Sequence, residues 1–284
     1  MRIAVIVVNF HTGSVLGDCL RRVLRCPEVA ELVLVDNGSP PGEIDALITG
    51  LDDRRILRID LPANPGFAVA CNRGARLAHS PWLLFLNPDC LIEADTLTRL
   101  AQVAQANPGL GALGALLVDA QGRPEPASLR RDPVPARAIA SALGLDRFQA
   151  VEGVPVAIPP AASAPIQGDA ISGALMLVRR EAHTATRGFD EGYFMHGEDL
   201  DLCRRMRELG FEVWCDPRVK VVHLKGVSSR RHPLRVQFAK HRGLLRYFDK
   251  FDAPRLSWPL RVLIRCGAVG RLGIGVVQTL LWPR

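Results

Sequence analysis

Two adjacent carboxylates, Glu198 and Asp199, are the residues of this chain best placed for acid–base chemistry. They follow a glycine-rich loop that carries Tyr193 and Phe194, and they open a segment with the apolar spacing of a helix. Aromatic neighbours can desolvate a carboxylate enough for it to act as a base near neutral pH. Acidic residues also suit the first turn of any helix, so the pair alone fits either a catalytic or a capping role.

Polar residues also stand where predicted strands end, which is where α/β proteins bind ligands. Asp36 and Asn37 could bind a nucleotide base or ribose. Asp89, in the run Asn87-Pro88-Asp89, could bind Mg²⁺ or Mn²⁺, because such ions need only one or two protein carboxylates when a substrate supplies phosphates. Both stretches are also good turn sequences, so neither identifies a function by itself.

Two further segments carry residues that packing alone does not require. Gly66 permits a close approach, and the helix predicted after it carries Asn72 and Gly74 where an apolar face would be expected. His223 ends a predicted strand beside a Gly/Ser/Arg loop, a position suited to binding metal or phosphate. The alternatives are an ordinary helix start and, for the histidine, a structural or exposed side chain.

The elements that must position these residues alternate between short apolar runs and helical patterns. This rhythm predicts an α/β protein with a mainly parallel, doubly wound sheet. Strands are predicted at residues 3–8, 31–36, 55–59, 82–86 and 171–178, and as a final pair at 212–215 and 219–223. Helices are predicted at residues 15–24, 44–48, 68–77 and 96–106.

Charge divides the chain unevenly. Residues 218–284 hold 15 Lys/Arg and only two Asp, a net charge of +13, and the remainder carries −6. Such a basic end favours phosphate on nucleic acid, on an anionic lipid or on a substrate. The uncharged run 272–282 has 11 residues and is too short to span a bilayer. With four arginines nearby it could lie on an anionic membrane or pack on the core as a terminal helix.

Composition bounds the organisation and the compartment. We expect one domain over residues 1–250, with an irregular, Pro-rich and partly mobile excursion at 119–168, followed by a basic, amphipathic extension at 251–284. The seven scattered cysteines exclude a disulfide framework and a structural zinc site, and they favour a reducing cytosol. The first apolar run is too short for a signal peptide. A cytoplasmic protein on the inner face of the membrane is therefore expected.

In their order along the chain, these segments resemble the family-2 inverting glycosyltransferases of the GT-A fold, particularly bacterial rhamnosyltransferase-like members. The matching segments are residues 7–10, 35–39, 64–74, 86–89, 172–174, 188–205 and 223–228. The resemblance implies a GT-A type, Rossmann-like fold, with a twisted sheet flanked by helices and a helical C-terminal extension. Asn87 stands where the family's Asp-x-Asp motif begins, so Asp89 is its surviving carboxylate.

The resemblance also implies a role for each candidate residue. Asp199 would deprotonate the acceptor hydroxyl, with Glu198 as the second candidate. Asp89 and His223 would hold Mg²⁺ or Mn²⁺ on the donor diphosphate. The nucleotide sugar would be bound by Val8, Asn9, Phe10, Asp36, Asn37, Asn64, Gly66, Asn72, Gly74, Asn87, Gly173, Lys225 and Arg230.

The predicted reaction is the transfer of a sugar from a dTDP-, UDP- or GDP-sugar, for example L-rhamnose from dTDP-rhamnose. The acceptor would be a saccharide, free or linked to polyprenyl diphosphate, in cell-surface polysaccharide synthesis. One alternative is a sugar-nucleotide pyrophosphorylase, although residues 11–14 lack the Gly-rich, Lys-containing loop that it needs. Another is a non-catalytic carbohydrate- or nucleic-acid-binding protein. The chain has few aromatics for stacking bases and no recognisable reader module, so no nucleic-acid partner is expected.

Overall fold

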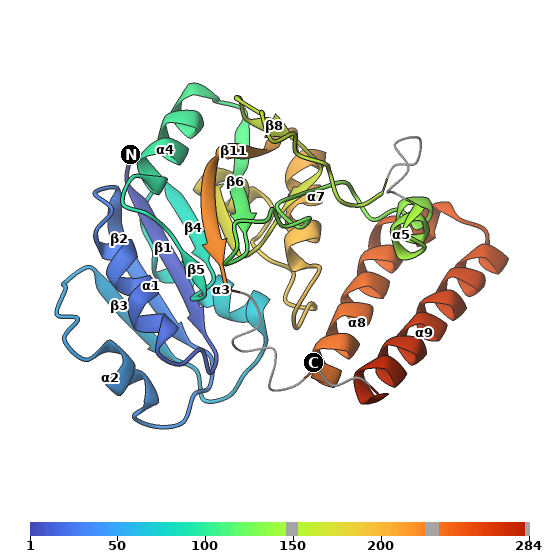
Figure 1. The fold of residues 1–284 in the computed structure, drawn as a ribbon, viewed down its shortest axis with the longest axis horizontal. Helices are drawn as coiled ribbons and strands as arrows, with labels where there is room; N and C mark the ends of the chain where they lie inside the picture. The colour runs from blue at the N-terminus through green and yellow to red at the C-terminus, as the bar shows by residue number, and fades with distance from the viewer. Residues whose placement is uncertain (146–152, 225–232, 282–284) are drawn as a thin grey trace.

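The computed structural model describes residues 1–145, 153–224 and 233–281. Within these residues a nine-stranded sheet lies at the centre, with helices on both faces (Figure 1). Its strands are β1 (Ile3–Asn9), β2 (Val29–Asp36), β3 (Ile56–Asp60), β4 (Trp82–Leu86), β5 (Cys90–Leu91), β6 (Leu110–Val118), β8 (Ile166–Gln167), β10 (Leu175–Arg179) and β11 (Glu212–His223). A second, two-stranded sheet pairs β7 (Leu129–Arg130) with β9 (Ala170–Ile171).

The strand order is β3-β2-β1-β4-β10-β6-β11-β5, and β8 pairs with β11. The first four strands are parallel, as predicted for a doubly wound sheet. Strand β10 runs antiparallel to both β4 and β6, so the sheet as a whole is mixed. Because β1, β2 and β4 are parallel, their carboxyl ends lie at one end of the sheet, and the chain order reverses between β1 and β4. In α/β proteins this switch point is where ligands bind.

Alternating side chains of β1 build a hydrophobic core on each face of the sheet. Ile3, Val5 and Val7 pack with one group of helices, and the residues between them pack with another. The first group is α1 (Val15–Leu24), α2 (Glu43–Ile48) and α4 (Thr96–Ala106). The second group is α3 (Phe67–Leu77), α6 (Arg180–Ala185) and α7 (Glu198–Glu208). The predicted helices are therefore present, within one residue at each end.

Three of the predicted strands are divided or joined differently in the structure. The run 171–178 is divided into β9 and β10 because residues 172–174 leave the ladder, and the Gly173 amide donates instead to the Asp199 carboxylate, at 3.0 Å. The expected pair 212–215 and 219–223 is the single strand β11, whose register shifts between Asp216 and Lys220. At that shift the Asp216 side chain accepts from the Arg218 amide, at 3.0 Å, which accommodates the irregularity without a break.

The described part of the Pro-rich segment 119–168 contacts the body of the protein through its strands and its first turns. It contains β7, β8 and α5 (Pro135–Ala142), and β7 pairs with β9. The Glu125 amide donates to the Leu117 carbonyl at 2.9 Å, and the Ser128 hydroxyl accepts from the Leu117 amide at 3.0 Å. These bonds tie the start of the segment to the end of β6. The mobility of the segment and the division at residue 250 stay predictions.

The C-terminal part forms two helices, α8 (Pro233–Phe251) and α9 (Trp258–Leu281), joined through the 3₁₀ turn η3 (Ala253–Arg255). They lie side by side at one end of the molecule (Figure 1). Helix α8 buries Tyr247, Phe248 and Phe251, whereas no described side chain of α9 is fully buried. The terminal helix therefore packs along α8 and not within the core. None of the described helices combines the length and the apolarity that crossing a membrane requires.

Candidate active site

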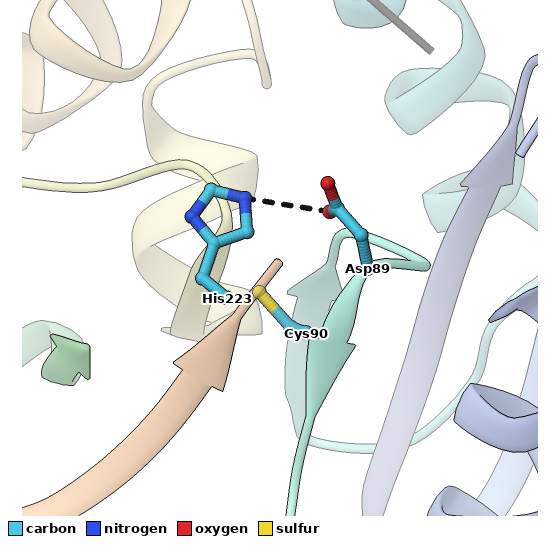
Figure 2. A group of neighbouring side chains, drawn as sticks. All are labelled: Asp89, Cys90 and His223. Atoms are coloured by element: carbon cyan, nitrogen blue, oxygen red, sulfur yellow. Dashed lines mark ion pairs between the residues drawn. The ribbon is translucent and has the colours of Figure 1, made fainter. Parts of the chain in front are cut away.

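Asp89 and His223, which are 134 positions apart in the sequence, meet at the edge of the sheet (Figure 2). Asp89 lies in the turn between β4 and β5, and His223 ends β11, which pairs with β5. Their nearest atoms, Asp89 Oδ1 and His223 Nε2, are 3.3 Å apart. The Leu224 amide donates to the Asp89 carbonyl at 2.9 Å and fixes the backbone of the pair. The structure thus brings together the two residues predicted to bind metal.

Glu125 lies behind His223 and was not expected from the sequence. Its carboxylate is 3.2 Å from His223 Nδ1, and only 3% of its side chain is exposed. Burial alone would lower the pKa of His223, but hydrogen bonds to Asp89 and Glu125 raise this pKa to about 9. An imidazolium therefore lies between two carboxylates at neutral pH.

These residues fit a hard divalent cation that also binds phosphate. The ligand atoms of Asp89, Cys90 and His223 lie within 4.8 Å of one another (Figure 2). Cys90 is the least suitable member, because burial raises the pKa of its thiol well above the usual value and its Sγ donates to the Ala174 carbonyl. One carboxylate and, once metal binding displaces the proton of His223, one imidazole remain, a donor set that leaves room for the oxygens of a diphosphate.

Asp199 lies in the first turn of α7 and is held by three donors. Its Oδ2 accepts from Arg130 Nη2 at 2.6 Å and from the Gly173 amide at 3.0 Å, and its Oδ1 accepts from the Leu200 amide at 2.8 Å. Burial alone would raise the pKa of Asp199, but the Arg130 guanidinium and the two amides lower it. This carboxylate is therefore ionised across the physiological pH range.

Glu198, the neighbouring residue, has its pKa shifted in the opposite direction. It is 6% exposed, and its Oε2 has no hydrogen-bond partner among the described residues. Burial and the charge of Asp199 raise the pKa of Glu198. Two adjacent carboxylates therefore differ in protonation because only one of them contacts a guanidinium, which is how proteins separate acid and base roles.

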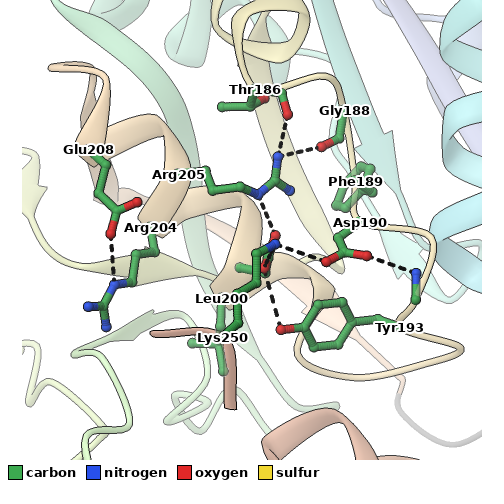
Figure 3. Close-up of polar contacts among 12 residues, drawn as sticks. Thr186, Gly188, Phe189, Asp190, Tyr193, Leu200, Arg204, Arg205, Glu208 and Lys250 are labelled. Carbon is green, nitrogen blue, oxygen red and sulfur yellow. Dashed lines mark hydrogen bonds and ion pairs between the residues drawn. The ribbon is translucent and has the colours of Figure 1, made fainter. Parts of the chain in front are cut away.

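The loop before these carboxylates is braced from α3, α7 and α8, and Figure 3 shows the contacts from α7 and α8. The Asn72 side chain accepts from the Phe189 amide and donates to the Phe189 carbonyl, both at 2.9 Å. Arg205 donates to the carbonyls of Thr186 and Gly188. Lys250 contacts both Asp190, at 2.9 Å, and the fully buried Asp201, at 2.6 Å. The position of Glu198 and Asp199 is therefore set by a closed network of polar contacts.

Residues predicted for the nucleotide pocket gather at the ends of β1 and β2. Asn9 Nδ2 donates to Ser39 Oγ at 3.0 Å, and Asn37 Nδ2 donates to Asn64 Oδ1 at 2.9 Å. The side-chain carbonyl oxygens of Asn9 and Asn37 are buried and have no partner among the described residues. Asp36, at the end of β2, accepts from the Ser39 amide at 3.3 Å. Two buried acceptor oxygens at the ends of β1 and β2 are thus left without a partner among the described residues.

Other predicted pocket residues have different surroundings. Gly74 packs on the sheet, where an added Cβ would lie 2.6 Å from Ile6 Cγ2, and Asn72 braces the loop before α7. Gly66, at φ +108°, lets the chain approach the Phe194 carbonyl, which accepts from the Phe67 amide. Close packing thus explains two of these glycines without a ligand. The remaining described members are Gly173, whose backbone amide donates to Asp199, Val8, which is buried in the core, Phe10, whose ring lies 4.5 Å from His11, and Asn87, whose backbone amide donates to the Ala174 carbonyl. Lys225 and Arg230 lie outside the described residues.

Comparison with known proteins decides the family. Residues 1–240 match the model of the glycosyltransferase-like family 2. The chain belongs to this family. It is similar to the N-acetylglucosaminyl-diphospho-decaprenol L-rhamnosyltransferase of Mycobacterium tuberculosis, with 30% identity over 90% of this chain and 88% of that protein. The resemblance found in the sequence is thereby confirmed.

Solved structures confirm the GT-A fold of this family-2 glycosyltransferase. The mannosyltransferase PcManGT from Pyrobaculum calidifontis, in complex with GDP-Man and Mn²⁺, superimposes with a TM-score of 0.61 at 16% identity, over 100% of this chain and 76% of that one. GalNAc-T7 with UDP, GalNAc and Mn²⁺ gives 0.59 at 17% identity, over 84% of this chain and 48% of that one. The enzyme class predicted from the sequence, a hexosyltransferase, is confirmed, and the pyrophosphorylase and binding-protein alternatives find no support.

The glycosyltransferase site contains two residues that sequence reasoning missed, Glu125 and Arg130. Both come from the Pro-rich segment, and each contacts one of the predicted site residues, His223 or Asp199. The only signal in the sequence is that buried charges need partners, and it does not say which partners.

Proposed function

We propose that this enzyme transfers a sugar, with inversion, from a nucleoside-diphosphate sugar to a saccharide carried on polyprenyl diphosphate in cell-surface polysaccharide synthesis. L-rhamnose from dTDP-rhamnose is the donor we favour, because the rhamnosyltransferase relative matches nearly the whole chain. The observation that carries the proposal is the pairing of an ionised, buried Asp199 with a separate Asp89–His223 site on the same side of the sheet. Direct displacement needs a base on one side of the sugar and charge neutralisation on the other.

In the proposed reaction, Asp199 takes the proton of the acceptor hydroxyl while that oxygen forms a bond to the anomeric carbon. The bond from that carbon to the diphosphate oxygen breaks, and the electron pair leaves with the nucleoside diphosphate. Asp89 and His223 would hold Mg²⁺ or Mn²⁺, which supplies positive charge to the departing diphosphate. Asn9, Asp36 and Asn37 would hold the base and ribose, and the side-chain oxygens of Asn9 and Asn37 have no partner among the described residues.

The pH dependence separates the two candidate bases. The pKa of Asp199 is below its usual 3.8, so a reaction that uses Asp199 keeps its rate as the pH falls to about 5. The pKa of Glu198 is raised from 4.5, so a reaction that uses Glu198 loses rate as the pH falls through the neutral range. A flat profile between pH 6 and 8 supports Asp199, and a steep rise supports Glu198.

The C-terminal helices support a peripheral position on the cytoplasmic face of an anionic membrane. Helix α9 exposes large apolar side chains, including 74% of Trp258 and 67% of Leu263. Arg261, Arg265 and Arg271 recur along the same helix. Aromatic and aliphatic residues beside arginines are typical of helices that lie in the membrane interface. An enzyme held there would meet an acceptor that is anchored by its lipid.

The test is a donor screen that measures released nucleotide from dTDP-, UDP- and GDP-sugars with Mg²⁺ or Mn²⁺ and a lipid-linked acceptor. We expect metal-dependent release from one donor, abolished by Asp89→Ala. The matched control is Asp95→Ala, an exposed carboxylate that pairs with Arg99 at the start of α4. Absence of release from every donor, together with absence of nucleotide binding by calorimetry, would overturn the proposal.

A further inference from the structure

A groove of about 610 Å³ lies between α8 and α9, beside the loop that precedes α7. Three cations line it, Arg242, Arg246 and Lys250, and they recur every four residues along α8. This spacing places them on one face of the helix. The apolar side chains Phe238 and Leu272 share the lining, and Phe238 is 54% exposed. The groove therefore combines a row of positive charge with an open apolar surface.

The acidic residues of the groove already have partners. Asp190 contacts Arg246 at 2.8 Å, and Asp249 contacts Arg265 at 2.8 Å. Arg242 is exposed and makes no ion pair with any residue in the described part of the chain. A bound anion therefore meets at least one guanidinium that no described carboxylate neutralises, and a guanidinium is well suited to phosphate oxygens.

The groove is joined directly to the loop that carries the base. Gly243 of α8 packs so closely on this loop that an added Cβ would lie 2.1 Å from the His196 carbonyl oxygen. The Arg246 guanidinium lies 5.3 Å from the centre of the Tyr193 ring. His196 and Tyr193 precede Asp199 by only a few residues, so a group held in the groove lies beside the acceptor half of the reaction.

We propose that this groove binds the diphosphate and the first isoprene units of the lipid-linked acceptor. The inference rests on the proposed function and adds the place where the lipid diphosphate is recognised. The Asp89–His223 site is assigned to the diphosphate of the donor, so the acceptor diphosphate needs a cationic site of its own. The groove supplies one next to an apolar surface, and the exposed face of α9 continues that surface toward the membrane.

The test is a calorimetric titration of the full chain with farnesyl diphosphate, a short polyprenyl diphosphate, while excess dTDP and Mn²⁺ fill the donor site. We expect binding by the wild-type protein and at least a tenfold loss of affinity in Arg242→Glu. The matched control is Arg54→Glu, which makes the same change of charge at an exposed arginine in the turn before β3 that does not line the groove. The control is expected to keep the wild-type affinity.

Three results would overturn the groove. The first is that the wild-type protein does not bind farnesyl diphosphate. The second is an equal loss of affinity in both variants, which would indicate general electrostatic attraction. The third is an equal affinity for inorganic diphosphate, which would show that the isoprene units are not recognised. The proposed function fails in a different way: farnesyl diphosphate binds as expected, but no sugar is transferred to any lipid-linked acceptor. Transfer with an unchanged KM for the lipid acceptor in Arg242→Glu would count against the groove alone.

Discussion

The two halves of the proposed active site hold their carboxylates in opposite ways. On the leaving-group side, Asp89 faces an imidazolium, and a second carboxylate, Glu125, supports that imidazolium from behind. On the acceptor side, Asp199 faces the guanidinium of Arg130 and two backbone amides. The first arrangement gathers negative charge around a place that a cation can take. The second keeps a single carboxylate ionised while its neighbour Glu198 is protonated.

Both supporting residues come from one short stretch of the Pro-rich segment, five positions apart. Glu125 has an acidic side chain and Arg130 a basic one, so the stretch gives each half of the site a partner of the opposite sign. The sheet places Asp89 and His223, helix α7 places Asp199, and this stretch acts on the charge states of His223 and Asp199. Substitutions in the stretch are therefore expected to affect the two halves separately.

The largest expected effect is that of Asp199→Asn. An amide accepts no proton from the acceptor hydroxyl, so kcat should fall by about 10²–10⁴-fold, as expected for loss of a general base. Binding of the donor nucleotide and of Mn²⁺ should stay within a factor of two of wild type, because the other half of the site is intact. Steady-state kinetics and calorimetry on the same preparation measure both quantities. If Asp199→Asn keeps more than a tenth of the wild-type kcat, Asp199 is not the general base.

The next effect concerns the leaving-group side and needs no substrate. Glu125→Gln removes one of the two carboxylates that raise the pKa of His223 to about 9, so this pKa should fall by at least one unit toward its usual 6.5. NMR titration of ¹³C-labelled histidine measures the change directly. A histidine with a raised pKa stabilises the fold below its unfolded pKa, and this contribution is lost as the pH rises through about 9.

In Glu125→Gln this loss of stability should therefore begin at a lower pH than in wild type. Asp119→Asn serves as the control, because Asp119 lies in the same segment but pairs with the exposed Arg123. An unchanged titration of His223 in Glu125→Gln would show that Asp89 alone sets the charge of His223. The Pro-rich segment would then support only the Asp199 half of the site.

A smaller effect is expected from Arg130→Gln on the acceptor side. Without the guanidinium, the pKa of Asp199 should rise by about 1–3 units, and the acidic limb of the pH–rate profile should rise with it. Activity at pH 5 should then fall more than activity at pH 8, because the base is protonated first at low pH. Arg130→Lys should restore part of the wild-type profile. A uniform loss of rate at all pH values would instead indicate that Arg130 acts only on folding.

Local pattern explains what the sequence could predict. Continuous apolar runs identify the buried strands β1 and β4, and periodic apolar residues identify the helix α7. The parallel half of the sheet could therefore be predicted. The pairing of Asp89 with His223 followed from the resemblance to a family. Arg130 and Glu125 are 69 and 98 residues from their partners and belong to no motif, so only the folded chain brings them into contact.

Asn72 is a case in which the sequence suggested a ligand-binding role and the structure shows a structural one. It is a polar residue on an otherwise packed helix, which favours a ligand-binding role from sequence alone. In the structure this amide is used for hydrogen bonds to the backbone of Phe189. A buried polar side chain must find partners, and the backbone of a neighbouring loop satisfies it as well as a ligand does.

The smallest effect on catalysis, but a measurable one on stability, is expected from Tyr247→Phe. The buried Tyr247 hydroxyl donates to Asp132 at 2.9 Å and accepts from Arg204 at 3.3 Å, which connects α8 to the Pro-rich segment and to α7. Loss of this hydroxyl removes one hydrogen-bond partner from each of the buried groups Asp132 and Arg204. The free energy of unfolding should therefore fall by about 1–3 kcal/mol. Urea denaturation measures this cost.

Because Asp132 lies close in sequence to both Glu125 and Arg130, Tyr247→Phe also tests whether the segment acts as one body. If the segment moves as one unit, Tyr247→Phe should cause small shifts both in the pKa of His223 and in the acidic limb of the pH–rate profile that Asp199 sets. A change confined to one of the two would show that Glu125 and Arg130 are held independently. The two halves of the site would then share a stretch of sequence but not a common support.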